Sequence, residues 1–168
     1  MHQFELPNPV LLSIKLGHGA AHGLSIKRVS WGYRKIPLSH GRHHIGRIVP
    51  CQGHPVLAVE SVEERLVAQA LAKRAQCERL TSQPVTIWYG WKGRLRRYTP
   101  DFCAWLSPTV PRDLALRGAG HQTMIEVKPA HRALIDPDTW SLLQQVVWTA
   151  TAMPLILLTA QSAKEGTR

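Results

Sequence analysis

The chain of 168 residues is short of cysteines, of long apolar runs and of acidic residues. Its three cysteines, Cys51, Cys77 and Cys103, are odd in number and widely spaced, so neither a disulfide framework nor a CxxC zinc site is expected. No apolar run approaches the ~20 residues that cross a bilayer. The first residues also lack the basic-then-apolar order of a signal peptide. We therefore expect a reduced, intracellular protein that does not associate with a membrane.

Basic residues outnumber acidic ones, with 21 Lys and Arg against 11 Asp and Glu, which gives a formal net charge of +10. A surface of this kind attracts polyanions, because each neutralised phosphate releases condensed counterions. Charge kept only for solubility is the alternative. The 44% of hydrophobic residues and the chain length predict one globular domain with a sizeable core.

Sequence patterns predict two helices and several strands. Ser61, with Glu64 three residues later, marks the start of a helix over 61–80. Asp136-Pro137-Asp138 marks the start of the second helix. Alternating and β-branched segments predict strands at 55–59, 84–89, 95–105, 122–128 and 154–159.

Residues 1–30 show no period and are predicted to be an N-terminal arm or lead-in, while residues 107–120 are predicted to be a loop. The order helix, three strands, helix and strand predicts an α/β domain over residues 31–168, with a mixed central sheet flanked by helices.

Two short strings carry charged residues at the ends of predicted strands. Asp101 lies in Tyr98-Thr99-Pro100-Asp101-Phe102, and Glu126 and Lys128 lie in Ile125-Glu126-Val127-Lys128-Pro129. Because strand side chains alternate between faces, Glu126 and Lys128 must point to the same side. Charged groups in an apolar strand are costly to bury unless they are paired or bind an ion. Two carboxylates beside an ammonium suit one or two hard cations, Mg²⁺ or Mn²⁺, and a positioned water.

Each of these residues also has an ordinary explanation. Asp101 fits a turn, Glu126 and Lys128 fit an exposed ion pair, and Glu64 fits a helix start, where the macrodipole favours carboxylates. Taken in chain order, a helical Glu, an Asp after Pro and a Glu-x-Lys form the pattern of the PD-(D/E)xK nuclease superfold. The pattern predicts a restriction-endonuclease-like fold and a Mg²⁺-dependent DNA endonuclease.

The chain resembles, more closely, the TnsA-type endonucleases, which are partner subunits of heteromeric cut-and-paste transposases. The resemblance covers about residues 31–129. Besides the two strings above, it is carried by Tyr33-Arg34-Lys35-Ile36-Pro37, Gly46-Arg47, Glu60-Ser61-Val62-Glu63-Glu64-Arg65 and Gln83-Pro84. The catalytic positions that it implies are Glu64, rather than Glu63, with Asp101, Glu126 and Lys128.

In the mechanism that we expect, Asp101 and Glu126 hold the metal ion, with the Val127 carbonyl as a further ligand. Lys128 orients the attacking water, and Glu64 supports the ion or its water. The resemblance implies cleavage of the 5′ strands of double-stranded DNA at transposon ends. It also implies two partners, a TnsB-like transposase subunit that processes the 3′ ends and a TnsC-like ATPase regulator. The expected location is the prokaryotic cytoplasm, in association with the nucleoid.

Well-studied members of that family carry a second, C-terminal domain of the DNA-binding type. We expect none here, because the last predicted strand ends close to residue 168. Cations that could contact the DNA backbone are predicted at Arg34, Lys35, Arg42, Lys92, Arg94, Arg96 and Arg97. The alternative for the last four is a solvated turn.

Two other functions remain open from the sequence. One is a stand-alone nuclease of the same fold, such as a restriction-like enzyme or a junction resolvase. The other is a non-catalytic DNA-binding subunit that serves assembly. The complete set of acidic residues and lysine argues against the second.

Overall fold

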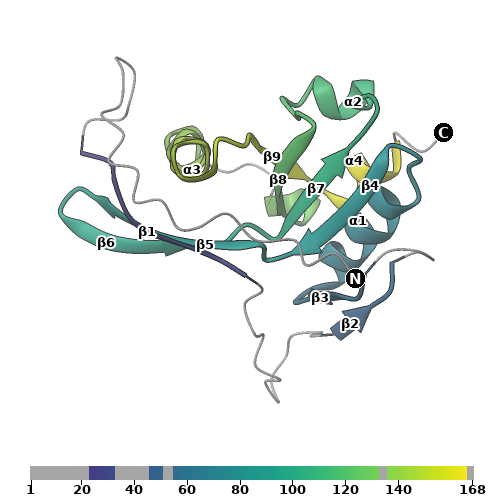
Figure 1. Ribbon diagram of the computed structural model, residues 1–168, viewed down its shortest axis with the longest axis horizontal. Helices are drawn as coiled ribbons and strands as arrows, with labels where there is room; N and C mark the ends of the chain where they lie inside the picture. The colour runs from purple at the N-terminus through teal and green to yellow at the C-terminus, as the bar shows by residue number, and fades with distance from the viewer. Residues whose placement is uncertain (1–22, 33–45, 51–54, 133–135, 166–168) are drawn as a thin grey trace, which may run out of the picture.

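The computed structural model describes residues 23–32, 46–50, 55–132 and 136–165. Within these residues the strands form three sheets in a mixed α/β arrangement (Figure 1). The first sheet holds β1 (Ser25–Trp31), β5 (Val85–Trp91) and β6 (Arg94–Tyr98), in the order β1-β5-β6. The second holds β4 (Cys77–Ser82), β7 (Phe102–Leu106), β8 (Gln122–Val127) and β9 (Leu155–Leu158), in the order β4-β7-β8-β9. The third pairs β2 (Gly46–Ile48) with β3 (Leu57–Val59).

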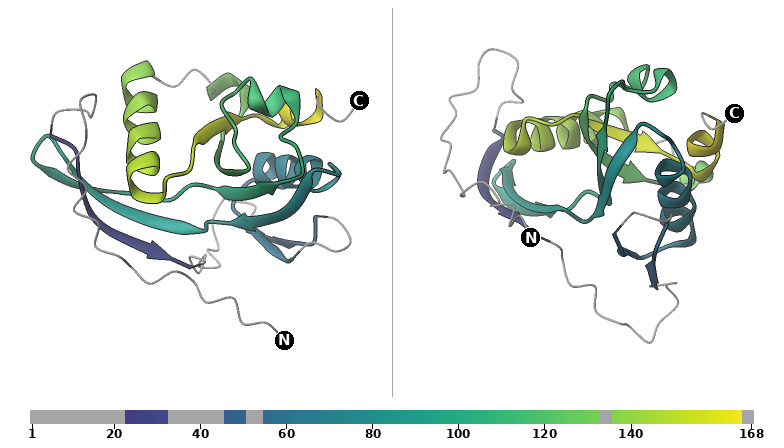
Figure 2. Two further views of the ribbon diagram at one scale, coloured as in Figure 1. Left: turned by 45° about the horizontal axis from the view of Figure 1, so that its top comes forward. Right: turned by 45° about the vertical axis from the view of Figure 1, so that its right-hand side comes forward.

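Helices cover both faces of the four-stranded sheet. The helical segments are α1 (Val62–Ala72), α2 (Arg112–Ala115), the 3-10 helix η1 (Ala130–Arg132), α3 (Pro137–Thr151) and α4 (Ala160–Glu165). Alternation along the strands sends Phe102 and Ile125 into a core with α1. It sends Cys103 and Met124 into a second core with α3. Figure 2 shows α3 lying against the first sheet as well. Residues of β1 and β5 accordingly belong to the second core.

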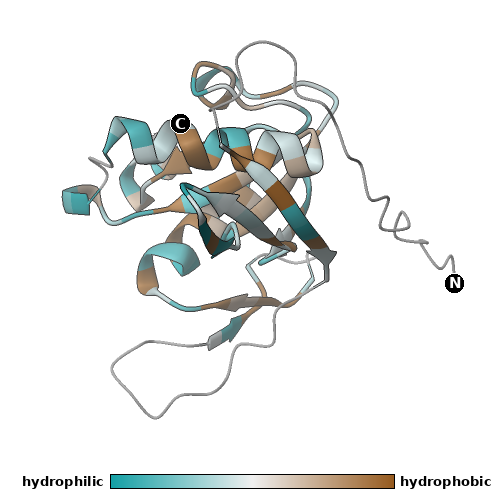
Figure 3. Cartoon of the chain, turned by 90° about the vertical axis from the view of Figure 1, so that its left-hand side faces the viewer, coloured by the Kyte–Doolittle hydropathy of each residue, from teal (hydrophilic) through white to brown (hydrophobic). Residues whose placement is uncertain are grey.

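The second sheet is antiparallel except where β8 pairs in parallel with β9. The carboxyl ends of β8 and β9 therefore lie at the same edge of the sheet. Figure 3 shows that hydrophobic and hydrophilic residues both occur along the strands of the chain. Among the described residues no helix is long and apolar enough to cross a membrane.

The predicted start of the first helix is confirmed, but its predicted end is wrong. Ser61 is the N-cap and its side chain accepts a hydrogen bond from the Glu64 N–H. The helix ends at Ala72, and residues 77–80, which were predicted to be helical, belong to β4. The reason is tertiary, because β4 pairs with β7 and buries Leu80 completely. Such non-local pairing overrides helix propensity.

The predicted strand over 95–105 is two strands in two different sheets. β6 ends at Tyr98, β7 begins at Phe102, and β6 pairs with β5 while β7 pairs with β4 and β8. Pro100, at the break, has no N–H to donate to a ladder. The break leaves Asp101 in the passage from one sheet to the other.

The N-terminal boundary also needs a correction. Ser25–Trp31, most of which was predicted to belong to an irregular lead-in, forms β1 and pairs with β5. Residues 1–22, the remainder of the predicted arm, lie outside the described residues. The predicted loop at 107–120 contains the short helix α2. The second helix begins as predicted, with Asp136 as N-cap and Pro137 in the first turn.

Arg74, just after α1, is hydrogen-bonded to residues of α2 and α4. It is 5% exposed, and its two terminal nitrogens each donate to one oxygen of Asp113 over 2.9 Å. Nη2 also donates to the Ala163 carbonyl over 3.0 Å. The hydrogen bond from Arg74 holds the pKa of Asp113 below its usual range. This buried fork ties the residue after α1 to α2 and α4.

Candidate active site

Asp101 is held in place by three hydrogen bonds across the break between β6 and β7. Its N–H donates to the Ile125 carbonyl over 3.0 Å, and its carbonyl accepts from the Gln83 N–H over 2.8 Å. The carboxylate Oδ2 accepts from the Val127 N–H over 2.7 Å. The aspartate is therefore fixed to the carboxyl end of β8, where Glu126 and Lys128 lie.

Glu126 and Lys128 lie on the same face of the strand, as alternation predicts. Glu126 is 7% exposed, and its two carboxylate oxygens have different partners. Oε1 accepts from Lys128 Nζ over 2.5 Å, and Oε2 accepts from the Tyr98 hydroxyl over 2.7 Å. The Lys128 N–H donates to the Leu158 carbonyl, which extends the parallel pairing of β8 with β9.

Glu64 closes the start of α1 and is 8% exposed. Its Oε2 accepts from the Glu60 N–H over 2.7 Å, and its Oε1 accepts from the Ser61 hydroxyl over 3.0 Å. Its own N–H donates to Ser61 Oγ over 3.1 Å. The arrangement resembles a capping box, except that the Glu64 carboxylate accepts from the N–H of Glu60 and not from that of the N-cap Ser61. The ordinary explanation for Glu64, as part of the helix start, is therefore seen in the structure.

The charge of Glu64 also acts on Asp101. Burial raises the pKa of Asp101 well above its usual value, and the charges of Glu126 and Glu64 raise it further. The Val127 N–H and the Lys128 ammonium act in the opposite direction. Charges that raise the pKa of a buried carboxyl act from nearby positions. The four predicted side chains therefore lie in one electrostatic environment.

The pKa values of Glu64 and Lys128 are also raised. Burial raises the pKa of Glu64, the hydrogen bonds from Glu60 and Ser61 oppose it, and Glu126 is among the charges that add to it. Burial would lower the pKa of Lys128, but its hydrogen bond to Glu126 and the surrounding carboxylates raise it. The ammonium therefore stays protonated at neutral pH.

Three carboxylates face one ammonium, so the fully ionised group carries an excess of negative charge in a poorly hydrated place. Such an excess is relieved either by protonation or by a bound cation. The donor atoms are all oxygens, which are the ligands of Mg²⁺ and Mn²⁺. The chemistry of the group therefore fits a hard divalent ion.

Within the described ranges, no cluster of three or more His, Cys, Asp or Glu side chains is arranged to hold a metal ion. The oxygens of Glu64 are engaged by the helix start. A ligand set built from this geometry would therefore draw on the carboxylates of Asp101 and Glu126 and on the Val127 carbonyl. Glu64 would act through its charge.

Tyr98 is a residue of the site that sequence reasoning missed. In a single strand over 95–105, Tyr98 and Asp101 would lie on opposite faces, three positions apart. The break after Tyr98 removes that constraint and lets both reach β8. Burial raises the pKa of Tyr98 well above its usual value, and the Glu126 carboxylate adds to the effect. The neutral hydroxyl therefore donates to Glu126 and fixes its orientation.

The predicted DNA-contacting residues divide into two groups. Arg34, Lys35 and Arg42 lie outside the described residues. The others, Lys92, Arg94, Arg96 and Arg97, are all exposed on the turn and strand that follow β5. Lys92 and Gly93 form the turn with φ angles of 48° and 73°.

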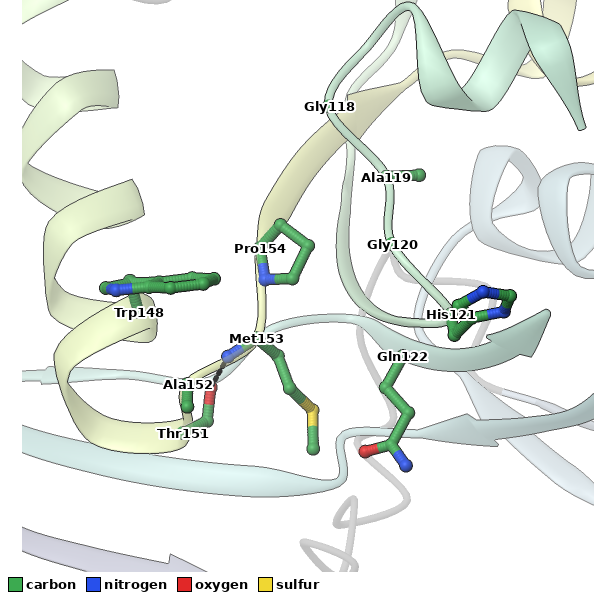
Figure 4. Close-up of a pocket in the computed structure, with 10 residues that line it drawn as sticks. All are labelled: Gly118, Ala119, Gly120, His121, Gln122, Trp148, Thr151, Ala152, Met153 and Pro154. Carbon is green, nitrogen blue, oxygen red and sulfur yellow. Dashed lines mark hydrogen bonds between the residues drawn. The ribbon is translucent and has the colours of Figure 1, made fainter. Parts of the chain in front are cut away.

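A pocket of about 590 Å³ lies away from the carboxylates (Figure 4). It is lined by the loop before β8, with Gly120 and His121, and by the end of α3 and the start of β9, with Trp148 and Pro154. These are the amino ends of β8 and β9, whereas the carboxylates lie at the carboxyl end of β8. None of the predicted site residues lines this pocket.

Comparison of the chain with protein families, with curated proteins and with solved structures gave no match.

Proposed function

We propose that this protein is a metal-dependent DNA endonuclease of the restriction-endonuclease-like fold and that it hydrolyses phosphodiester bonds. One observation carries the proposal. Asp101 is hydrogen-bonded to the Val127 N–H, between Glu126 and its ion-pair partner Lys128, and burial together with the charges of Glu126 and Glu64 raises the pKa of Asp101. Perturbed titratable groups that converge from distant parts of a chain are typical of active sites.

The position of the group in the fold adds support. Asp101 and Glu126 lie at the carboxyl end of β8, next to its parallel neighbour β9. Ligands of open α/β sheets commonly bind at the carboxyl ends of parallel strands. Glu126 lies in β8 and Glu64 in the first turn of α1, while three hydrogen bonds hold Asp101 in the break between β6 and β7, as an accurate site requires.

In the proposed reaction, Asp101 and Glu126 bind a Mg²⁺ or Mn²⁺ ion together with the Val127 carbonyl. An ion held by these residues would supply Lewis-acid activation of a water molecule and charge stabilisation of the departing oxyanion. Lys128 orients that water, because its ammonium has three donors and the bond to Glu126 uses one of them. Tyr98 keeps the second oxygen of Glu126 fixed. Glu64 strengthens the negative field of the site.

The finer identification rests on the sequence resemblance over residues 31–129. We propose that the protein is a TnsA-type subunit that cuts the 5′ strands of DNA at transposon ends. It would act with a TnsB-like transposase subunit and under a TnsC-like ATPase. The net charge of +10 is consistent with double-stranded DNA as the substrate.

The proposal is tested by incubating the purified protein with labelled duplex DNA that carries transposon ends, with Mg²⁺, with Mn²⁺ or with a chelator. We expect strand cleavage that needs the metal ion and that leaves a 3′ hydroxyl and a 5′ phosphate. Cleavage only after addition of a TnsB-like subunit indicates the transposase role, whereas cleavage without it indicates a stand-alone nuclease. DNA binding with no cleavage under either condition would overturn the catalytic proposal and favour an assembly subunit.

A further inference from the structure

The edge strand β6 carries cations on both of its faces, and only one face leads to the carboxylates. In the register of β6 with β5, Arg96 lies opposite Tyr89 and Tyr98 lies opposite Ile87. Directly paired residues share a face. Arg97, by contrast, lies opposite Trp88 and therefore belongs to the other face.

The hydroxyl of Tyr98 identifies the face that belongs to the site. Because Tyr98 donates to Glu126, the face of β6 that carries Tyr98 is the face toward the carboxylates. Arg94 and Arg96 precede Tyr98 on this face at two-residue intervals, and both are exposed. From Val85 to Tyr98 the sequence contains no acidic residue that could neutralise them.

The opposite face has a different character. The Arg28 guanidinium lies 5.0 Å from the centre of the Trp88 ring, on the strand next to Arg97. A Cβ built on Gly90 would lie 3.3 Å from Lys27 Cε, which places this lysine on the same outer face. The outer face therefore has cations of its own, but neither Tyr98 nor a catalytic carboxylate lies on it.

We propose that the row Arg94, Arg96 and Tyr98 guides the scissile DNA strand into the active site. From Arg94 to Tyr98 the strand spans roughly 13 Å at about 3.3 Å per residue. That length corresponds to about four nucleotides of one DNA strand at roughly 3.4 Å each. On this scale Arg94 and Arg96 are about two nucleotides apart, and their guanidinium groups suit phosphates of the same strand. The inference rests on the proposed nuclease function and assigns its substrate path.

The test compares two pairs of substitutions that remove the same charge from exposed positions of one sheet. One protein carries Arg94→Ser and Arg96→Ser, and its control carries Lys27→Ser and Arg28→Ser, two exposed residues of β1 on the outer face. Binding of a fluorescein-labelled 30-base-pair duplex is followed by anisotropy, in a chelating buffer and at several salt concentrations. The chelator keeps the binding measurement independent of cleavage.

We expect the first pair to weaken binding about 10- to 100-fold and to reduce the slope of log affinity against log salt by about 1.8. The control pair should change affinity less than about 3-fold. Equal losses in the two proteins, or a greater loss in the control, would overturn the assignment of the face. A different outcome would overturn the nuclease proposal. In that outcome the two variants differ in binding as expected, but the wild-type protein never cleaves DNA with a metal ion.

Two further outcomes distinguish this guiding role from protection of the edge strand and from binding of RNA. Charges on an edge strand also protect it from pairing with other chains. If the Arg94 and Arg96 variant aggregates in light scattering but binds DNA normally, the arginines only protect the edge and the proposal is wrong. Unlabelled duplex RNA and duplex DNA can also be compared as competitors of the labelled duplex. If the RNA competes more strongly, the proposal that a DNA strand binds along Arg94 and Arg96 is wrong.

Discussion

Replacing Asp101 by asparagine is expected to lower metal-dependent DNA cleavage at least about 1,000-fold, which corresponds to about 4 kcal/mol of transition-state stabilisation. The asparagine keeps an oxygen that can accept from the Val127 N–H, so the fold around the β6–β7 break should survive. It cannot supply a charged ligand beside Glu126. DNA affinity should stay the same or rise, because one negative charge near the phosphates is lost.

The same substitution should stabilise the protein when no divalent ion is present. The pKa of Asp101 is raised in the folded state, so the folded protein binds more protons than the unfolded chain above the ordinary pKa of about 3.9. The free energy of unfolding of the wild type therefore falls as the pH rises from about 4 through the raised pKa of Asp101. Asparagine does not titrate, so its advantage should grow over that pH range and be complete once Asp101 is fully ionised.

Thermal unfolding in a chelating buffer measures this effect. We expect Asp101→Asn to unfold at a higher temperature than the wild type at pH 7.5. Mg²⁺ should raise the melting temperature of the wild type and leave that of the variant unchanged. Asp138→Asn, at an exposed position of α3, serves as the control and should alter neither cleavage nor stability appreciably. Normal cleavage by the Asp101 variant would contradict the assigned role of the aspartate.

Replacing Asp113 by alanine should cause the largest loss of stability, about 3 to 5 kcal/mol. The substitution leaves the Arg74 guanidinium, whose side chain is 2% exposed, buried without its counter-charge. The expected fall in melting temperature is about 10 °C for a domain of this size. Asp138→Ala, the same substitution at an exposed site, should cost less than about 1 kcal/mol.

The pH dependence and a double variant make this prediction specific. Because Arg74 lowers the pKa of Asp113, the stabilisation is present above the ordinary pKa of about 3.9 and is lost as the pH falls through the lowered pKa. Combining Arg74→Met with Asp113→Leu should restore most of the lost stability, since no buried charge is then left unpaired. A double variant that is no more stable than Asp113→Ala would show that the ion pair is not the cause.

Local signals in the sequence predicted the parts of the fold that local chemistry decides. Ser61 and Asp136 each accept from a backbone N–H three residues ahead, and both helices begin where these caps require. The end of α1 could not be predicted in this way. Residues 77–82 are a strand because of their partner β7, which lies more than twenty positions further along the chain.

In the candidate site, too, local sequence signals predicted some positions, and tertiary structure determined the others. Alternation along β8 was enough to place Glu126 and Lys128 on one face, where they form an ion pair. The position of Asp101 depends on Pro100, which ends one sheet pairing and lets the chain cross to the next sheet. Because the sequence pattern favoured one continuous strand, it could not reveal that Tyr98 also reaches Glu126. The double role of Glu64 as helix cap and site carboxylate likewise needs the three-dimensional arrangement.

The central claim is that Asp101 and Glu126 share a divalent cation at the carboxyl end of β8. Anomalous X-ray diffraction from crystals soaked in Mn²⁺ tests it most directly. The account predicts an anomalous peak at about 2.0–2.3 Å from a carboxylate oxygen of each residue and from the Val127 carbonyl. A well-diffracting crystal with no peak there, or with Mn²⁺ bound to only one of the two carboxylates, would contradict the account.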